Sequence, residues 1–105
     1  MLLQDYNLTM TTCKEGPCKD SSCAIVELSD NIISILPHLS KIIKGCTYDP
    51  VVNIMSFCRK GMNVALYARL IVILNVKDEA AARRAIDWLK DIILNADEKN
   101  GESGG

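Results

Sequence analysis

Five cysteines are the residues of this chain whose chemistry goes beyond packing, because thiols can ligate a metal, close disulfides or cycle between two redox states. Three of them recur at even spacing in one short polar stretch: Cys13, Cys18 and Cys23. The other two, Cys46 and Cys58, lie in more apolar sequence. Each use of these thiols implies a different class of protein.

Metal binding is one possible use of the three N-terminal thiols. Structural zinc sites take four ligands, usually with close cysteine pairs, and iron–sulfur clusters also take four thiolates. The even spacing provides no such pair, and a fourth ligand would have to be Cys46, Cys58 or His38. We therefore expect no cofactor, and zinc or an iron–sulfur cluster is the alternative.

Disulfides fit the same cysteines better, because they would tether a polar arm to the rest of the chain. A bridge that closes a loop of tens of residues contributes about 3–4 kcal/mol in the chain-entropy model. An odd number of cysteines leaves at least one thiol free or paired between subunits. Cys46 and Cys58 can also be explained as small buried hydrophobic residues. The connectivity stays open, and the candidates are Cys13, Cys18, Cys23, Cys46 and Cys58.

A catalytic constellation is not evident. The sole histidine, His38, follows Pro37 in an apolar stretch, where a surface or half-buried position is expected. No Ser/His/Asp or Cys/His arrangement can be assembled around it, and no Cys-x2-Cys redox motif is present. The pair Asp78-Glu79 fits stabilisation of a helix N-terminus. We predict that the protein is not an enzyme.

The bulk composition bounds the class of protein. With 105 residues, 49% of them hydrophobic and 24% charged, the chain fits one globular domain. The net charge of −1 argues against nucleic-acid binding, and the pairs Arg59-Lys60 and Arg83-Arg84 are interpreted as a solvated turn and a helix face. No apolar run approaches the roughly 18 residues of a membrane span, and no secretory signal is recognisable. A cytoplasmic location follows as an expectation.

The cysteine content also bears on the source of the protein. Mesophilic cytosols keep thiols reduced, whereas hyperthermophiles build disulfides inside the cell. A single glutamine and abundant isoleucine and charge favour a thermophile, while seven asparagines weigh against it. A thermophilic origin is therefore expected.

Hydrophobic periodicity divides the chain into three parts: a polar, irregular arm over 1–22, a domain over 23–96 and a disordered polar tail over 97–105. From residue 25 to 43, apolar side chains recur at three- and four-residue steps, which predicts an amphipathic helix. Pro37 should kink this helix or begin a second, shorter one. A strand over Cys23–Leu28 followed by a helix is the alternative.

The second half of the chain predicts three strands and a helix. The strands cover Val51–Cys58, Asn63–Tyr67 and Leu70–Val76, and the helix runs from an N-cap at Asp78 to about Asn95. One stripe of this helix is apolar: Ala82, Ala85, Ile86, Leu89, Ile92 and Ile93. The predicted fold is α+β, an antiparallel sheet of three to four strands with two helices packed on one face.

The strands also predict self-association. Leu70–Leu74 is apolar at every position, and Met55 and Phe57 are assigned to the second face of the first strand. Two helices on one face leave this second apolar face to be covered by the N-terminal arm or by another copy of the protein. We favour a homodimer formed through the apolar sheet face.

Three short motifs resemble one half-repeat of the TATA-box-binding protein fold: Tyr48-Asp49-Pro50, Val64-Ala65-Leu66 and Lys77-Asp78-Glu79. The resemblance covers about residues 30–95 and implies a helix, strands and a long helix in that order. The family needs two repeats to bind DNA, and this chain has room for one, so DNA binding does not carry over. The stretch Leu66–Ile71 also resembles a small archaeal domain found after iron–sulfur motifs, whose Cys-x2-Cys-Gly core is missing here.

These observations favour a small intracellular, non-catalytic protein that associates with itself or with a partner and is stabilised by disulfides. No nucleic acid and no membrane is expected among its partners. The alternative is a metal or iron–sulfur binding protein that uses the N-terminal cysteines.

Overall fold

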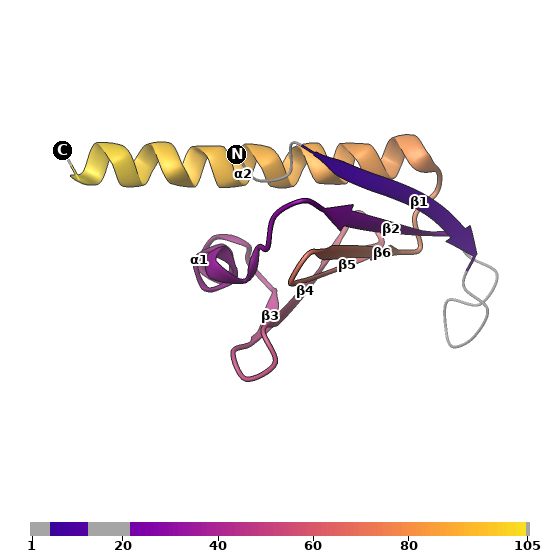
Figure 1. The fold of residues 1–105 in the computed structure, drawn as a ribbon, viewed down its shortest axis with the longest axis horizontal. Coiled ribbons are helices and arrows are strands. Elements are labelled where there is room, and N and C mark those ends of the chain that lie inside the picture. The colour runs from indigo at the N-terminus through magenta and orange to yellow at the C-terminus, as the bar shows by residue number, and fades with distance from the viewer. Residues whose placement is uncertain (1–4, 13–21, 105) are drawn as a thin grey trace.

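The computed structural model describes residues 5–12 and 22–104, which form a six-stranded antiparallel sheet and two α-helices (Figure 1). The spatial order of the strands is β1-β2-β6-β5-β4-β3. A 3₁₀ turn, η1 (Ile33–Ile35), leads into α1 (Leu36–Ile42), and α2 (Glu79–Gly104) follows the last strand. The strands are β1 (Tyr6–Thr12), β2 (Ser22–Leu28), β3 (Thr47–Asp49), β4 (Ile54–Arg59), β5 (Met62–Tyr67) and β6 (Leu70–Leu74).

The α+β class agrees with the sequence, but the predicted count of three to four strands is wrong. The three additional strands are β1, β2 and β3. β1 lies in the segment predicted to be irregular, where the alternating residues Tyr6, Leu8 and Met10 are half-buried against the core. β3 has only three residues and forms the opposite edge of the sheet.

β2 replaces the first part of the predicted helix, so the alternative assignment of Cys23–Leu28 to a strand is the right one. Its side chains alternate, with Ala24 and Val26 fully buried and Ile25 36% exposed. Backbone pairing with both β1 and β6 fixes this conformation. The helical spacing of the isoleucines misleads because these tertiary pairings outweigh local periodicity. The true helix α1 is short and begins with Pro37 in its first turn.

The β5–β6 hairpin turns through Ala68 and Arg69 without a glycine. Ala68 adopts a left-handed φ of 49°, which is strained for a residue with a Cβ. The last residue of β2 and the segment that follows it hold this turn from outside the hairpin. The backbone N–H of Leu28 donates to the Arg69 carbonyl at 2.7 Å, and that of Ile32 donates to the Ala68 carbonyl at 2.8 Å.

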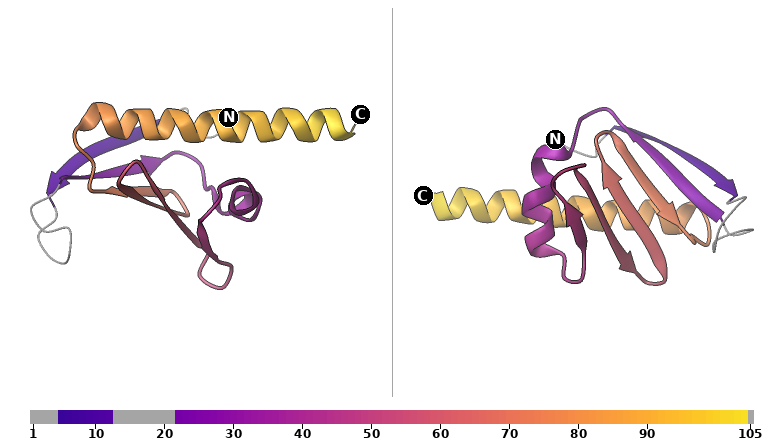
Figure 2. Two further views of the ribbon diagram at one scale, coloured as in Figure 1. Left: turned by 180° about the vertical axis from the view of Figure 1, so that it is seen from behind. Right: turned by 90° about the horizontal axis from the view of Figure 1, so that it is seen from below.

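The core lies on the face of the sheet that α2 crosses (Figure 2). One row of paired side chains illustrates it: Val26, Ile71, Leu66 and Met55 are each at most 1% exposed. α2 contributes the predicted stripe, in which five members are buried: Ala82, Ala85, Ile86, Leu89 and Ile93. α1 adds Leu36 and Leu39 to the same cluster.

Both ends of α2 can be compared with the prediction. The Asp78 carboxylate accepts the backbone N–H of Ala81 at 2.8 Å, as expected for an N-cap. The helix continues to Gly104 instead of ending near Asn95. Near its start, Arg83 donates to the Tyr6 hydroxyl at 3.3 Å and pairs with Glu79 at 3.4 Å. The Glu79 and Tyr6 hydrogen bonds raise the pKa of Arg83, and the Tyr6 bond connects β1 to the helix.

Candidate functional site

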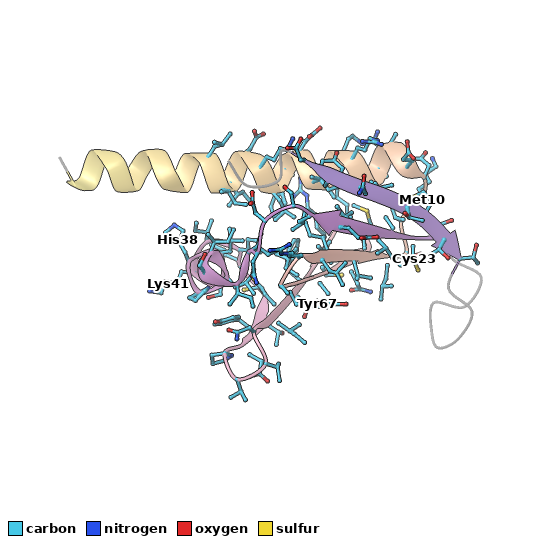
Figure 3. All side chains as sticks on the ribbon, viewed as in Figure 1. Met10, Cys23, His38, Lys41 and Tyr67 are labelled. Atoms are coloured by element: carbon cyan, nitrogen blue, oxygen red, sulfur yellow. The ribbon has the colours of Figure 1, made fainter. Side chains whose placement is uncertain are left out.

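The cysteines of the described residues do not gather at one place. Cys23 lies in β2 and is 4% exposed (labelled in Figure 3), and its sulfur is not a free thiol. Cys46 and Cys58 are free thiols, the first half-buried and the second exposed. Cys13 and Cys18 lie outside the described residues. The predicted set of thiols is therefore split among different parts of the fold.

The two free thiols have separate local partners. The Cys46 thiol donates to the backbone carbonyl of Ser40 at 3.3 Å, directly after α1. The Cys58 thiol donates to Oδ1 of Asn63 at 3.2 Å, across the β4–β5 pair. Cys58 and Cys23 point to the same side of the sheet, but β5 and β6 lie between their strands, which places them about 14 Å apart at the usual strand spacing. A direct bond between them is excluded by this distance.

His38 and the acidic residues provide no metal site within the described residues, where no group of three His, Cys, Asp or Glu side chains converges. His38 lies on α1 and is half-buried. Its Nε2 atom is buried and has no hydrogen-bond partner among the described atoms. No hydrogen bond or ion pair joins His38 to a described carboxylate or thiol, so the described residues assemble no hydrogen-bonded catalytic pair around the histidine.

The sheet face that points away from α2 carries apolar side chains that are not part of the core. At its centre lies a group of apolar side chains that we call the open face: Ile25, Ala65, Tyr67, Leu70, Val72 and Leu74. Strand register places Ile25 beside Val72 and Val72 beside Ala65. Figure 3 shows Tyr67 on the side of the sheet away from α2. No described helix covers this face (Figure 2).

The open face is shallowly hollowed. A depression of about 390 Å³ lies over β3 to β6, and Ala65, Val72 and Leu74 form part of its lining. Its remaining outward side chains are small or polar and come from Thr47, Ser56, Cys58 and Asn63. A polar margin around an apolar centre is the arrangement seen in protein–protein interfaces.

One sequence assignment to this face is wrong. Met55 and Phe57 are buried on the core side of β4, at 0% and 6% exposure, and do not extend the second apolar face. The outward residues of β4 are Ile54, Ser56 and Cys58. Sequence reasoning misses three members, Ile25, Ala65 and Tyr67, and it counts Ile25 in a helix stripe. The alternating pattern of β2 was the signal that could have identified it.

The fold contains no helix in its described part that is both long and apolar enough to cross a bilayer. Comparison of the chain with protein-family models, with curated proteins and with solved structures yields no match, so its function has to be inferred from its own surfaces.

Proposed function

We propose that this protein is an intracellular, non-catalytic module that forms a homodimer through the open face. The observation that carries the proposal is the apolar centre of a sheet face that no described helix covers. Antiparallel sheets that expose one face to water normally carry polar side chains there. Ile25, Leu70 and Val72 break that rule in the middle of the sheet, where a second copy of the chain could remove them from water.

The available area is sufficient for a specific interface. Six strands at a spacing of about 4.8 Å, each about 17 Å long, give a flat area of about 500 Å². The relief of the side chains makes the accessible area larger than this flat value. Specific dimers bury about 600–1,000 Å² on each partner. A second copy stacked on the open face would therefore match both the area and the apolar character that a stable dimer needs.

The polar residues around the edge of the open face suit packing against the same face of a second copy. On the β1 side, Thr9 and Glu27 are exposed and polar, and on the β3 side Thr47 and Ser56 are. An apolar centre with a polar rim suits two stacked sheets, which pack at about 10 Å with their side chains interdigitated. A second copy supplies the same centre and rim by symmetry, so no other partner is required.

The proposal includes a disulfide that joins Cys23 to Cys13 or Cys18. Cys46 and Cys58 are free, which leaves these two as partners of Cys23 within the chain. β1 ends at Thr12, which pairs with Ser22 beside Cys23, so such a bridge would close the end of the β1–β2 hairpin. Peptide mapping without reductant, on protein purified without chelator, tests the bridge. Bound zinc or iron in that protein would contradict it.

Sedimentation velocity in the presence of reductant tests the dimer. The reductant removes covalent dimers formed through the exposed Cys58 thiol. We expect the species to shift from 11.6 kDa to twice that mass as concentration rises. A mass of 11.6 kDa at every concentration up to the millimolar range would refute the proposal.

A further inference from the structure

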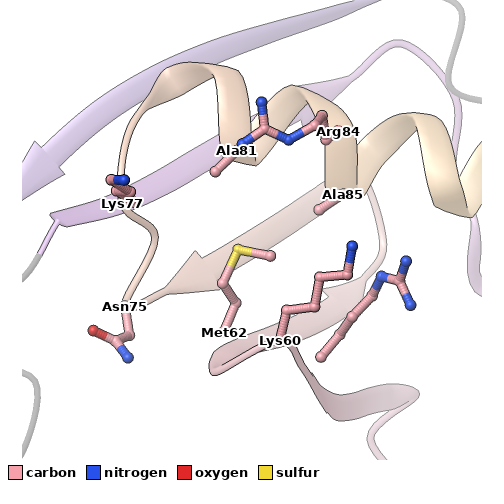
Figure 4. Close-up of a pocket in the computed structure, with 8 residues that line it drawn as sticks. Lys60, Met62, Asn75, Lys77, Ala81, Arg84 and Ala85 are labelled. Carbon is pink, nitrogen blue, oxygen red and sulfur yellow. The ribbon is translucent and has the colours of Figure 1, made fainter.

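A second surface, on the side of the sheet that α2 crosses, concentrates positive charge in a pocket. It lies where the β4–β5 turn meets the start of α2 and the segment between β6 and α2, and it measures about 220 Å³ (Figure 4). Its lining includes four basic residues: Arg59, Lys60, Lys77 and Arg84. In a chain with a net charge of −1, four cations around one pocket make the distribution of charge strongly uneven.

No carboxylate lines this pocket. Of the acidic residues near the lining in sequence, Asp78 caps α2 and Glu79 pairs with Arg83. That pair is the single ion pair among the described side chains, so none of the four pocket cations is neutralised by a described carboxylate. An anion that enters the pocket therefore meets four uncompensated charges.

The pocket is also held in shape. The Arg59 guanidinium stacks at 4.0 Å from the centroid of the Trp88 ring. Lys60 and Gly61 form a tight left-handed turn, with φ of 50° and 80°, and Asn75 Nδ2 donates to the Gly61 carbonyl at 2.9 Å. This bond ties the turn to the segment that precedes α2. Ordering these groups in advance lowers the entropic cost of binding.

The floor of the pocket is apolar. Met62, Ala81 and Ala85 also line the pocket and are each at most 9% exposed (Figure 4). A low-dielectric wall on one side strengthens the attraction between the cations and a bound anion, because field lines concentrate in the cleft. Lys60, Lys77 and Arg84 are themselves exposed and Arg59 is half-buried, so the cations surround the apolar floor at the surface.

We propose that this pocket binds a small phosphate-bearing molecule, a phosphomonoester or diphosphate. The planar forks of Arg59 and Arg84 suit bidentate hydrogen bonds to phosphate, and the two lysines add point charges. At about 30 Å³ per water, the pocket holds about seven water molecules. Its volume is below the roughly 300 Å³ at which pockets for drug-sized ligands begin. The ligand that fits the pocket is therefore a phosphate with a small attached group.

The test is an NMR titration of the ¹⁵N-labelled protein with pyrophosphate at constant ionic strength. We expect saturable shifts of the amide signals of Lys60, Gly61, Lys77 and Arg84. Arg84→Gln should raise the dissociation constant about tenfold or more, because it removes a charge-assisted hydrogen bond. Arg69→Gln is the matched control, since it makes the same charge change in the β5–β6 turn at the other end of β5, and it should leave the dissociation constant unchanged.

Four outcomes would overturn the proposal. One is the absence of saturable shifts at millimolar pyrophosphate, and another is an equal loss of affinity in Arg69→Gln and Arg84→Gln. The third is that citrate binds as tightly as pyrophosphate, which would assign the pocket to polycarboxylates. The fourth is that a thymidine oligonucleotide shifts the same signals with a steep salt dependence, which would assign the pocket to nucleic acid. The spectra of the variants also report whether each one is folded.

Discussion

Val72→Glu should convert the dimer to a folded monomer. Val72 lies in the middle of β6, with Ile25 and Ala65 as its cross-strand neighbours on the open face. A two-fold stack of sheets brings both copies of Val72 near the centre of the interface. The residue is half-buried within one protomer. Dimerisation therefore removes about half of its side chain from water, which stabilises the dimer by about 1 kcal/mol per copy.

A glutamate at this position loses that contribution and adds a desolvation cost of several kcal/mol per buried carboxylate. With two copies per dimer, we expect association to weaken by at least about 4 kcal/mol, or about a thousandfold in the dissociation constant. Within the protomer, the change removes only cross-strand contacts, which contribute about 0.2–1 kcal/mol. The variant should therefore stay folded, with a Tm lower by at most about 8 °C.

Analytical ultracentrifugation gives the dissociation constant, and circular dichroism confirms that the variant is folded. Val51→Glu is the matched control, because Val51 is 87% exposed and lies between β3 and β4, outside the open face. It should associate like the unmodified protein. A folded Val72→Glu variant with an unchanged dissociation constant would refute the stacking of the open face. Loss of association in Val51→Glu alone would indicate that the interface lies at the β3–β4 turn.

Three further predictions concern stability and reactivity. Ala68→Gly should raise the free energy of unfolding by up to about 1 kcal/mol in thermal melts, because it relieves the left-handed φ of 49°; a lower Tm would show that the turn is not strained. Asp78→Ala should lower that free energy by about 1 kcal/mol in urea titrations, since it removes the 2.8 Å bond to the Ala81 amide, and no change would mean that water replaces the cap. A maleimide followed by peptide mapping should label Cys58 before Cys46, which is half-buried; equal rates would contradict these exposures.

The parts of the fold that the sequence predicts are those whose burial follows local periodicity. The stripe from Ala82 to Ile93 points into the core, and β4, β5 and β6 lie within a few residues of their predicted bounds. β2 was assigned to a helix first, because Ile25, Leu28 and Ile32 have helical spacing. Only its neighbours β1 and β6 make it a strand, and neither contact can be inferred from the segment alone.

The sequence predicts one of the two candidate surfaces in part and the other not at all. The apolar run of β6 already indicated a second apolar face, although the contribution of Met55 and Phe57 was placed on the wrong side of β4. The basic pocket was not predicted, because Arg59, Lys77 and Arg84 come from three segments that meet only in the folded chain. One basic pair lies in a turn and the other in a helix, and nothing in the sequence indicates that the two pairs are close together in the fold.

Isotope-filtered NMR on a mixture of labelled and unlabelled protein, kept under reductant, tests the central claim most directly. Contacts between protomers appear as cross-peaks that join methyl groups of the labelled copy to protons of the unlabelled one. We predict such cross-peaks for the methyl groups of Ile25, Val72 and Leu74. Their absence in concentrated protein, or cross-peaks confined to Val51 and Val52, would contradict a dimer formed through the open face.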